Sequence, residues 1–302
     1  MKTHPRLFTK LFLEPLMLLP SARYGFELGL LNHMGLAHSG TVPQMGTGSD
    51  YESAPVKTRD EQIADMKAAQ QTQKEWRVAR IYEQYGNVAI IKMNGAIDKH
   101  LTDFEMSCYG GYDLADFDNA LSRAANDPKI DRVVLDINSP GGSVIGVPES
   151  AARVAALTQV KEVHSFVDMM ACSAAQYIAA QADVTACAPS ALLGSIGVYL
   201  SVVDATRWAE IEGYKVEIIR AGNFKAMGNP FKPLTDAERA LLQTRVNEIH
   251  TEFQAAVNAG RKGAVSDDDM QGQVIYGKDA VAKGLADIVT GQNLDEYVAS
   301  LL

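Results

Sequence analysis

The sequence predicts an α/β fold in which largely parallel sheets are flanked by helices. Short runs of apolar residues alternate with segments of helical periodicity between residues 88 and 260. The runs are nearly continuous in valine, isoleucine and leucine, which is typical of strands buried on both faces of a sheet. The composition, 47% hydrophobic and 22% charged over 302 residues, is that of a globular protein with a sizeable core.

The expected elements follow one another along this part of the chain. Strands are predicted at Val88–Met93, Val133–Ile137, Val163–Val167, Val184–Ala188 and Val216–Ile219, and helices at Asp113–Ala125, Ser143–Val160 and from Ser173. A long helix comes next, because Thr235 and Glu238 form a capping box. Its apolar residues recur three or four positions apart, at Leu242, Val246, Ile249, Phe253 and Val257.

An amino-terminal extension precedes the main domain. Residues 36–60 contain many glycine, proline and serine residues and few large apolar ones, which indicates a flexible linker. Residues 60–76 are rich in alanine, glutamine and lysine and predict a solvated helix. We therefore expect an extension and linker over residues 1–76 and one domain over residues 77–302.

Charge, cysteine content and hydropathy argue against several classes of partner and site. The net charge of −9 provides no basic surface for nucleic acid. Cys108, Cys172 and Cys187 are an odd number without ligand spacing, which favours neither disulfides nor a zinc site and fits the reducing cytoplasm. The sequence contains no uninterrupted apolar run of about 18 residues, so an integral membrane anchor is not expected.

The first candidate for chemistry is the turn Pro140-Gly141-Gly142, which follows a buried strand and opens the next predicted helix. Glycines let the backbone approach a ligand, and free N–H groups in such a turn can hold an oxyanion. The alternative is a tight strand-to-helix turn without function. The spacing matches neither a dinucleotide-binding nor a P-loop pattern.

The second candidate is Ser173, where a strand ends and a helix of small residues begins. A serine in this place is usually only a helix cap. The small neighbours leave room for a substrate, however, and the N–H of Ala174 could stabilise a developing negative charge. Cys172 has no histidine nearby to activate it and is interpreted as a packed thiol.

A serine nucleophile needs a base, and the region around Ser173 provides no histidine between residues 165 and 248. The same region contains Lys225, in a loop over residues 222–230 ahead of the long helix. Taken alone, Lys225 is typical of a solvated surface lysine.

These segments, in this order, resemble the signal peptide peptidase A family of Ser-Lys peptidases (peptidase family S49), which belongs to the wider ClpP/crotonase fold group. The matching pieces are Asn138-Ser139-Pro140-Gly141-Gly142, Cys172-Ser173-Ala174, Gly194-Ser195-Ile196-Gly197-Val198, Gly222-Asn223-Phe224-Lys225, and Tyr276-Gly277 with Gly284-Leu285-Ala286-Asp287. The resemblance implies a ClpP/crotonase-like fold.

The resemblance also implies roles for five residues. Ser173 would be the nucleophile, Lys225 its general base, and Ser195 the hydroxyl that orients the lysine. The backbone N–H groups of Gly142 and Ala174 would form the oxyanion hole. Alanine stands at 174 and 175 where the family often has two glycines, which leaves the N–H donor in place. The mechanism needs no metal or organic cofactor.

Two stretches resemble the phage branch of the family, the capsid maturation proteases: Glu14-Pro15-Leu16-Met17-Leu18 and Lys225-Ala226-Met227-Gly228-Asn229-Pro230-Phe231. This resemblance implies a homo-oligomeric head maturation protease that cleaves capsid or scaffold proteins. It would work in the host cytoplasm or the assembling prohead.

Three alternatives stay open. The first is a bacterial peptidase that degrades signal peptides. The second is an acyl-CoA enzyme of the crotonase type, although only Glu149 is near the candidate segments to serve as its base. The third is a catalytically silent scaffold protein with the same fold.

Overall fold

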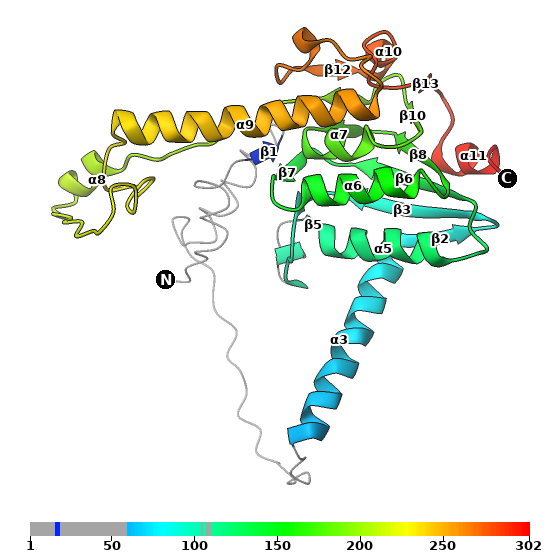
Figure 1. Cartoon of the computed structure of the whole chain (residues 1–302), viewed down its shortest axis with the longest axis horizontal. Coiled ribbons are helices and arrows are strands. Elements are labelled where there is room, and N and C mark those ends of the chain that lie inside the picture. Colours follow the sequence, from blue (N-terminus) through cyan, green and yellow to red (C-terminus); the bar gives the residue numbers. More distant parts are fainter. Residues whose placement is uncertain (1–15, 19–58, 104, 107–109) are drawn as a thin grey trace.

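The computed structural model describes residues 16–18, 59–103, 105–106 and 110–302 (Figure 1). The predicted linker over residues 36–60 lies outside the described residues except for its last two. Strand β1 (Leu16–Leu18) and helix α3 (Arg59–Ile81) are the described elements ahead of the sheet. The helix predicted for residues 60–76 is confirmed, and it continues to Ile81.

A six-stranded sheet forms the centre of the molecule, and its strands lie in the order β13-β10-β8-β6-β3-β2. All neighbours in this sheet are parallel except β2 and β3. The predicted α/β class with a largely parallel sheet is therefore confirmed. The strands are β2 (Tyr82–Tyr85), β3 (Val88–Asn94), β6 (Arg132–Asn138), β8 (Glu162–Val167), β10 (Val184–Cys187) and β13 (Ile288–Val289).

Helices cover both faces of this sheet, which explains why its strands are apolar throughout. Helices α5 (Leu114–Asn126), α6 (Val147–Leu157) and α7 (Ala174–Ala179) lie side by side on one face (Figure 1). Helix α11 (Leu294–Ala299) packs on the other face through Tyr297 and Val298.

The predicted helix at Ser143–Val160 begins later than expected. Residues Gly141–Ser143 form a short strand, β7, and α6 starts only at Val147. The residue before the helix is Gly146, whose φ of +88° suits glycine and delays the helical conformation.

The predicted strand at Val216–Ile219 is wrong. The segment has no regular structure, and the side chains of Val216 and Ile219 are 44% and 98% exposed. It belongs to a stretch that we call the arm, residues 199–235, which contains helix α8 (Thr206–Ile211). A run of β-branched residues has no strand to pair with there, because the arm lies away from the sheets (Figure 1).

Helix α9 (Asp236–Gly260) begins with the predicted capping box of Thr235 and Glu238. Only its carboxyl-terminal half packs on the core, where Phe253 stacks on Tyr177 with 5.0 Å between ring centroids. Leu242 and Val246 in the other half are only partly buried. The first turns of α9 therefore project beyond the sheet and carry the arm (Figure 1).

Two small sheets extend the molecule at the carboxyl ends of the central strands. One has the order β1-β7-β4-β5, with β4 (Ala96–Asp98) and β5 (Gly111–Asp113). The other has the order β12-β11-β9. Its strands are β9 (Met170–Cys172), β11 (Leu192–Gly194) and β12 (Val274–Tyr276).

Helix α10 (Gly277–Ala280) follows β12.

Among the helices that the structure describes, none is both long and apolar enough to span a lipid bilayer.

Candidate active site

Ser173 lies buried at a sharp strand-to-helix turn, between the end of β9 and the first residue of α7. Its φ of 55° and ψ of −117° are unusual for a residue other than glycine and carry a conformational cost. Two backbone hydrogen bonds hold it there: the N–H of Ser173 donates to Gly194 O at 2.7 Å, and the N–H of Tyr177 donates to Ser173 O at 2.9 Å. The backbone at this serine is therefore fixed by its surroundings.

The second serine, Ser195, lies beside the first. Strands β9 and β11 are parallel and end opposite each other at Cys172 and Gly194. Ser173 follows the first of these residues and Ser195 follows the second. Ser195 is also buried and also has a positive φ, 51°. Its N–H donates to Gln273 O at 2.7 Å, which fixes the turn from the β12 side.

Gly142 lies on β7, which is joined to the region of Ser173 through the turn that precedes it. The N–H of Ser139 donates to Met170 O at 2.9 Å, and the N–H of Cys172 donates to Ser139 O at 3.1 Å, which joins the turn before β7 to β9. At Gly142 an added Cβ would lie 1.8 Å from Ile97 O, so only glycine allows β7 to approach β4 this closely. Helix α7, which begins at Ala174, packs against β7.

Lys225 is the one predicted site residue that the structure does not bring to the others. It is exposed in a turn of the arm, where its N–H donates to Gly222 O at 3.3 Å. The arm lies beyond the amino-terminal end of α9, whereas α7 packs under the other half of that helix (Figure 1). Asp236 and Phe253 are about 25 Å apart along the axis of α9.

Cys172 and His164, a further potential nucleophile and base, have structural roles. Burial raises the pKa of Cys172 to about 12, so its thiol stays neutral. His164 is buried on β8, where its ring nitrogens contact Tyr297 Oη at 2.7 Å and Glu162 Oε1 at 2.9 Å, on the α11 side of the sheet. Within the described residues, no group of three or more histidine, cysteine or acidic side chains is arranged to hold a metal ion.

Sequence reasoning recognised Glu238 only as a helix cap and missed its second role. The Glu238 carboxylate also pairs with Lys232, at 2.5 Å from Nζ, and with Arg220, at 3.5 Å from its guanidinium. The hydrogen bond from Lys232, together with the N–H of Thr235, lowers the pKa of Glu238 to about 2. One carboxylate thus fastens both ends of the loop that carries Lys225 to the start of α9.

We expect Glu238→Gln to loosen this loop, because the variant keeps the size of the side chain and removes its charge. Trypsin should then cut after Lys225 roughly three- to tenfold faster than in the wild type, since fewer charge-assisted contacts oppose local opening. Peptide mapping over time measures this rate. Glu248→Gln, on an exposed face of the same helix, is the control, and equal rates in the two variants would rule out the anchoring role.

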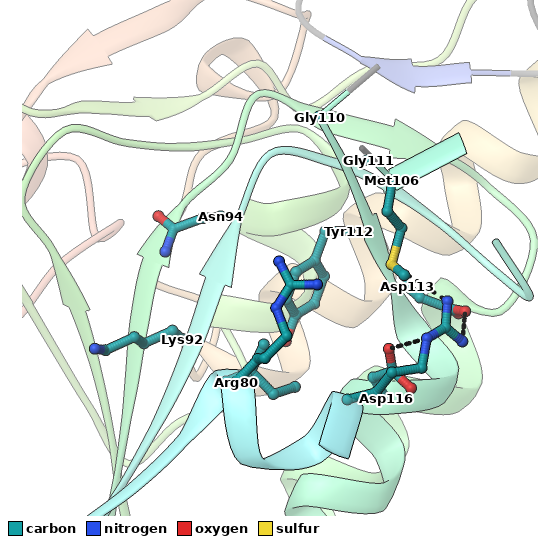
Figure 2. Close-up of a pocket in the computed structure, with 11 residues that line it drawn as sticks. Arg80, Lys92, Asn94, Met106, Gly110, Gly111, Tyr112, Asp113 and Asp116 are labelled. Carbon is teal, nitrogen blue, oxygen red and sulfur yellow. Dashed lines mark hydrogen bonds and ion pairs between the residues drawn. The ribbon is translucent and has the colours of Figure 1, made fainter. Parts of the chain in front are cut away.

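A pocket of about 290 Å³ lies near the end of β3, and Ser173, Ser195 and Lys225 are not among its lining residues. Figure 2 shows Lys92 and Asn94 on one side of it and Asp113 and Asp116 on the other, with Arg80 and Tyr112 between them. Its residues come from α3, β3, β5 and α5, which is why no local sequence pattern predicted it.

An ion-pair cluster borders this pocket and ties α3 to the domain. Arg77 lies 3.4 Å from Asp113 and 3.5 Å from Asp116, and its guanidinium donates to Leu101 O at 2.7 Å. Burial raises the pKa of Asp116 from 3.8 to about 6, which Arg77 opposes and the charge of Asp113 reinforces. The ionised form of Asp116 is therefore unfavourable in the folded protein.

This pKa predicts the sign of a pH effect on stability. The folded state binds a proton at Asp116 as the pH falls through about 6, before the unfolded chain does, so the wild type gains stability relative to Asp116→Asn. The gain between pH 7 and pH 5 should be about 1 kcal/mol. Denaturant unfolding at the two pH values measures it, with Asp295→Asn as the exposed control. A difference between wild type and Asp116→Asn that is the same at both pH values would contradict the prediction.

Part of the chain matches a peptidase family, and most of its length is similar to two phage proteins. Residues 155–301 match the model of Peptidase family S49. The chain is 28% identical over 94% of its length to the capsid assembly protease C of Escherichia phage lambda, and 30% identical over 91% to the head-tail preconnector protein GP5 of Enterobacteria phage P21. It is 29% identical over 53% of its length to the probable protease SohB of Haemophilus influenzae. The chain covers 62%, 53% and 46% of these three relatives.

Solved structures similar to this chain include two from the enoyl-CoA hydratase group. An enoyl-CoA hydratase/isomerase family protein from Silicibacter pomeroyi matches with a TM-score of 0.40 and 15% identity, over 73% of this chain and 79% of that one. An enoyl-CoA hydratase from Shewanella pealeana matches with a TM-score of 0.41 and 11% identity, over 76% of each chain. Similarity at this level carries no inference about the reaction.

Proposed function

We propose that the chain is a serine endopeptidase of peptidase family S49, whose family model matches residues 155–301, and that it works with a Ser173–Lys225 dyad. The observation that carries the proposal is the backbone of Ser173. A buried serine held at positive φ on a strand-to-helix turn, beside a second buried serine with positive φ, costs free energy that a mere helix cap would not require.

The proposed reaction begins when Ser173 Oγ attacks the carbonyl carbon of the scissile peptide bond and Lys225 Nζ accepts the hydroxyl proton. The oxyanion of the tetrahedral intermediate is stabilised by the N–H groups of Gly142 and Ala174. Lys225 then gives the proton to the leaving amine, and an acyl-enzyme on Ser173 remains. Water, deprotonated by Lys225, hydrolyses this ester and restores the serine. Ser195 is proposed to orient the lysine.

Lys225 has to be desolvated for this chemistry, because only the neutral amine can accept a proton and desolvation disfavours the ammonium form. The arm that carries it presents eight large exposed apolar side chains: Val203, Trp208, Ile211, Tyr214, Val216, Ile219, Phe224 and Phe231. A groove of about 310 Å³ between the arm and α9 is lined by Leu200, Val202, Leu234 and Leu242 among others. We infer that the arm packs against a second copy, so that a homo-oligomer buries this surface and assembles the dyad.

The biological role that fits best is phage head maturation, with capsid or scaffold proteins as substrates in the host cytoplasm or the prohead. The names of the lambda and P21 relatives support it. Residues 77–302 would form the peptidase domain and residues 1–76 its extension. The similarity to the probable protease SohB supports a second candidate, a bacterial peptidase, for which the motif resemblance implies signal peptides as substrates.

The proposal is tested by incubating the purified chain with capsid and scaffold proteins and with a signal peptide, and identifying the products by mass spectrometry. Cleavage of the capsid or scaffold proteins alone supports the phage role, and cleavage of the signal peptide alone supports the bacterial one. An acyl-CoA thioester assay belongs beside it. Thioester turnover without peptide cleavage would favour a crotonase-type enzyme, and neither activity would favour a silent scaffold.

A further inference from the structure

Strand β1 pairs with one edge of β7, although the two strands are far apart in the sequence. The two strands are antiparallel, with Leu16 opposite Ser143, Met17 opposite Gly142 and Leu18 opposite Gly141. The other edge of β7 is paired with β4. Residues 16–18 therefore complete the pairing of a strand whose second edge would otherwise be open.

This edge faces the candidate active site. Gly142, the proposed oxyanion donor, is the middle residue of β7, and α7, which begins directly after Ser173, packs against the strand. Figure 1 shows β1 and β7 next to the first turn of α7. An extended polypeptide on this edge would run past Ser173 with its backbone hydrogen-bonded to β7, the way that strands are added to an exposed sheet edge.

We propose that residues 16–18 block this edge in cis, so that a polypeptide substrate binds only after it displaces the chain's own strand. The inference rests on the proposed function, since it takes the β7 edge as the place where that substrate lies. The occupant is an intramolecular segment that competes at high effective concentration. Three residues of pairing is a short strand, so the block is reversible.

The block has a measurable consequence for binding. A site that is open for only a fraction of the time shows an affinity reduced by that fraction. Variants that weaken β1 should therefore bind an extended peptide more tightly than the wild type. The same variants should expose the backbone N–H groups of β7 to exchange with solvent.

The test uses the full chain with Ser173→Ala, so that no peptide is consumed, and compares Met17→Pro and Leu18→Pro with Met17→Ala and Leu18→Ala. Successive N–H groups of a strand point to opposite sides, so one of the two proline variants removes a donor that faces β7. The alanine variants keep both donors. The probe is a fluorescent peptide with the sequence of residues 12–20, FLEPLMLLP.

In at least one proline variant the peptide should bind about tenfold more tightly by fluorescence anisotropy than in its alanine partner. Amide exchange at residues 141–143 should be faster in that variant and slow again when the peptide is added. Unchanged affinity and unchanged exchange in both proline variants would overturn the block. Because neither readout needs turnover, a protein without peptidase activity could still pass this test, and an active peptidase could fail it.

Discussion

Ser173→Ala should abolish peptide cleavage while leaving the fold intact. Removal of a serine nucleophile typically costs at least about 10³-fold in kcat, because the remaining backbone donors stabilise the transition state only weakly on their own. The loss of one hydroxyl from a buried position should change the unfolding midpoint little. Initial rates on a peptide substrate and thermal unfolding, measured on the same preparation, separate the two effects.

The matched control is Ser190→Ala, an exposed serine in a turn, which should retain full activity. If Ser173→Ala keeps more than about a tenth of the wild-type rate, a loss far below that expected for a nucleophile, Ser173 is not the nucleophile. The double variant with Lys225→Ala should be scarcely worse than Ser173→Ala alone, because the two residues are proposed to act as one unit.

A mixture of the Ser173→Ala and Lys225→Ala proteins should regain activity that neither shows alone. Each site would take its serine from one copy and its lysine from the neighbouring copy, since the arm that carries Lys225 lies beyond the amino-terminal end of α9, whereas α7 of the same chain packs under the other half of that helix (Figure 1). Random pairing of equal amounts should restore about a quarter of the wild-type rate, because one combination in four has both residues.

The mixing experiment requires subunit exchange, so the two proteins are also co-expressed with different tags and purified through both. A co-purified assembly without activity would show that Lys225 acts within its own chain, or not at all. Failure of the two proteins to co-purify would contradict the proposed homo-oligomer.

The sequence predicted the central architecture because the strands of a parallel sheet covered on both faces are recognisable as continuous apolar runs. Four of the five predicted strands are present, at β3, β6, β8 and β10. The fifth, at Val216–Ile219, has the same composition without a sheet beside it. Burial is decided by tertiary neighbours, which a window of four residues does not contain.

The short strands of the two small sheets were missed for a related reason. Strands β7, β9 and β11 have three residues each and contain glycine, alanine or cysteine, so they lack a periodic signal. Their pairing is what brings Ser173 and Ser195 together. The resemblance to a family indicated these residues through their order, whereas propensity alone indicated only a helix cap.

The position of Lys225 could not be predicted from sequence at all. Spacing along the chain says nothing about which copy, or which side of a helix, a loop will face. Glu238 illustrates the same limit: its capping box was visible locally, but its pairing with Arg220 and Lys232 depends on how the arm folds back.

Helix α9 contacts the core only near Phe253, so the arm at its other end moves whenever the helix tilts about this contact. A tilt of about 5° would displace the amino-terminal end of α9, about 25 Å from Phe253, by about 2 Å. Proton transfer tolerates misplacement of about 1 Å poorly, so if Lys225 is the base, as proposed, the packing of α9 at Phe253 would limit how accurately Lys225 is positioned. The fidelity of the catalytic step would then depend on a pair of stacked rings, Tyr177 and Phe253, that never meet the substrate.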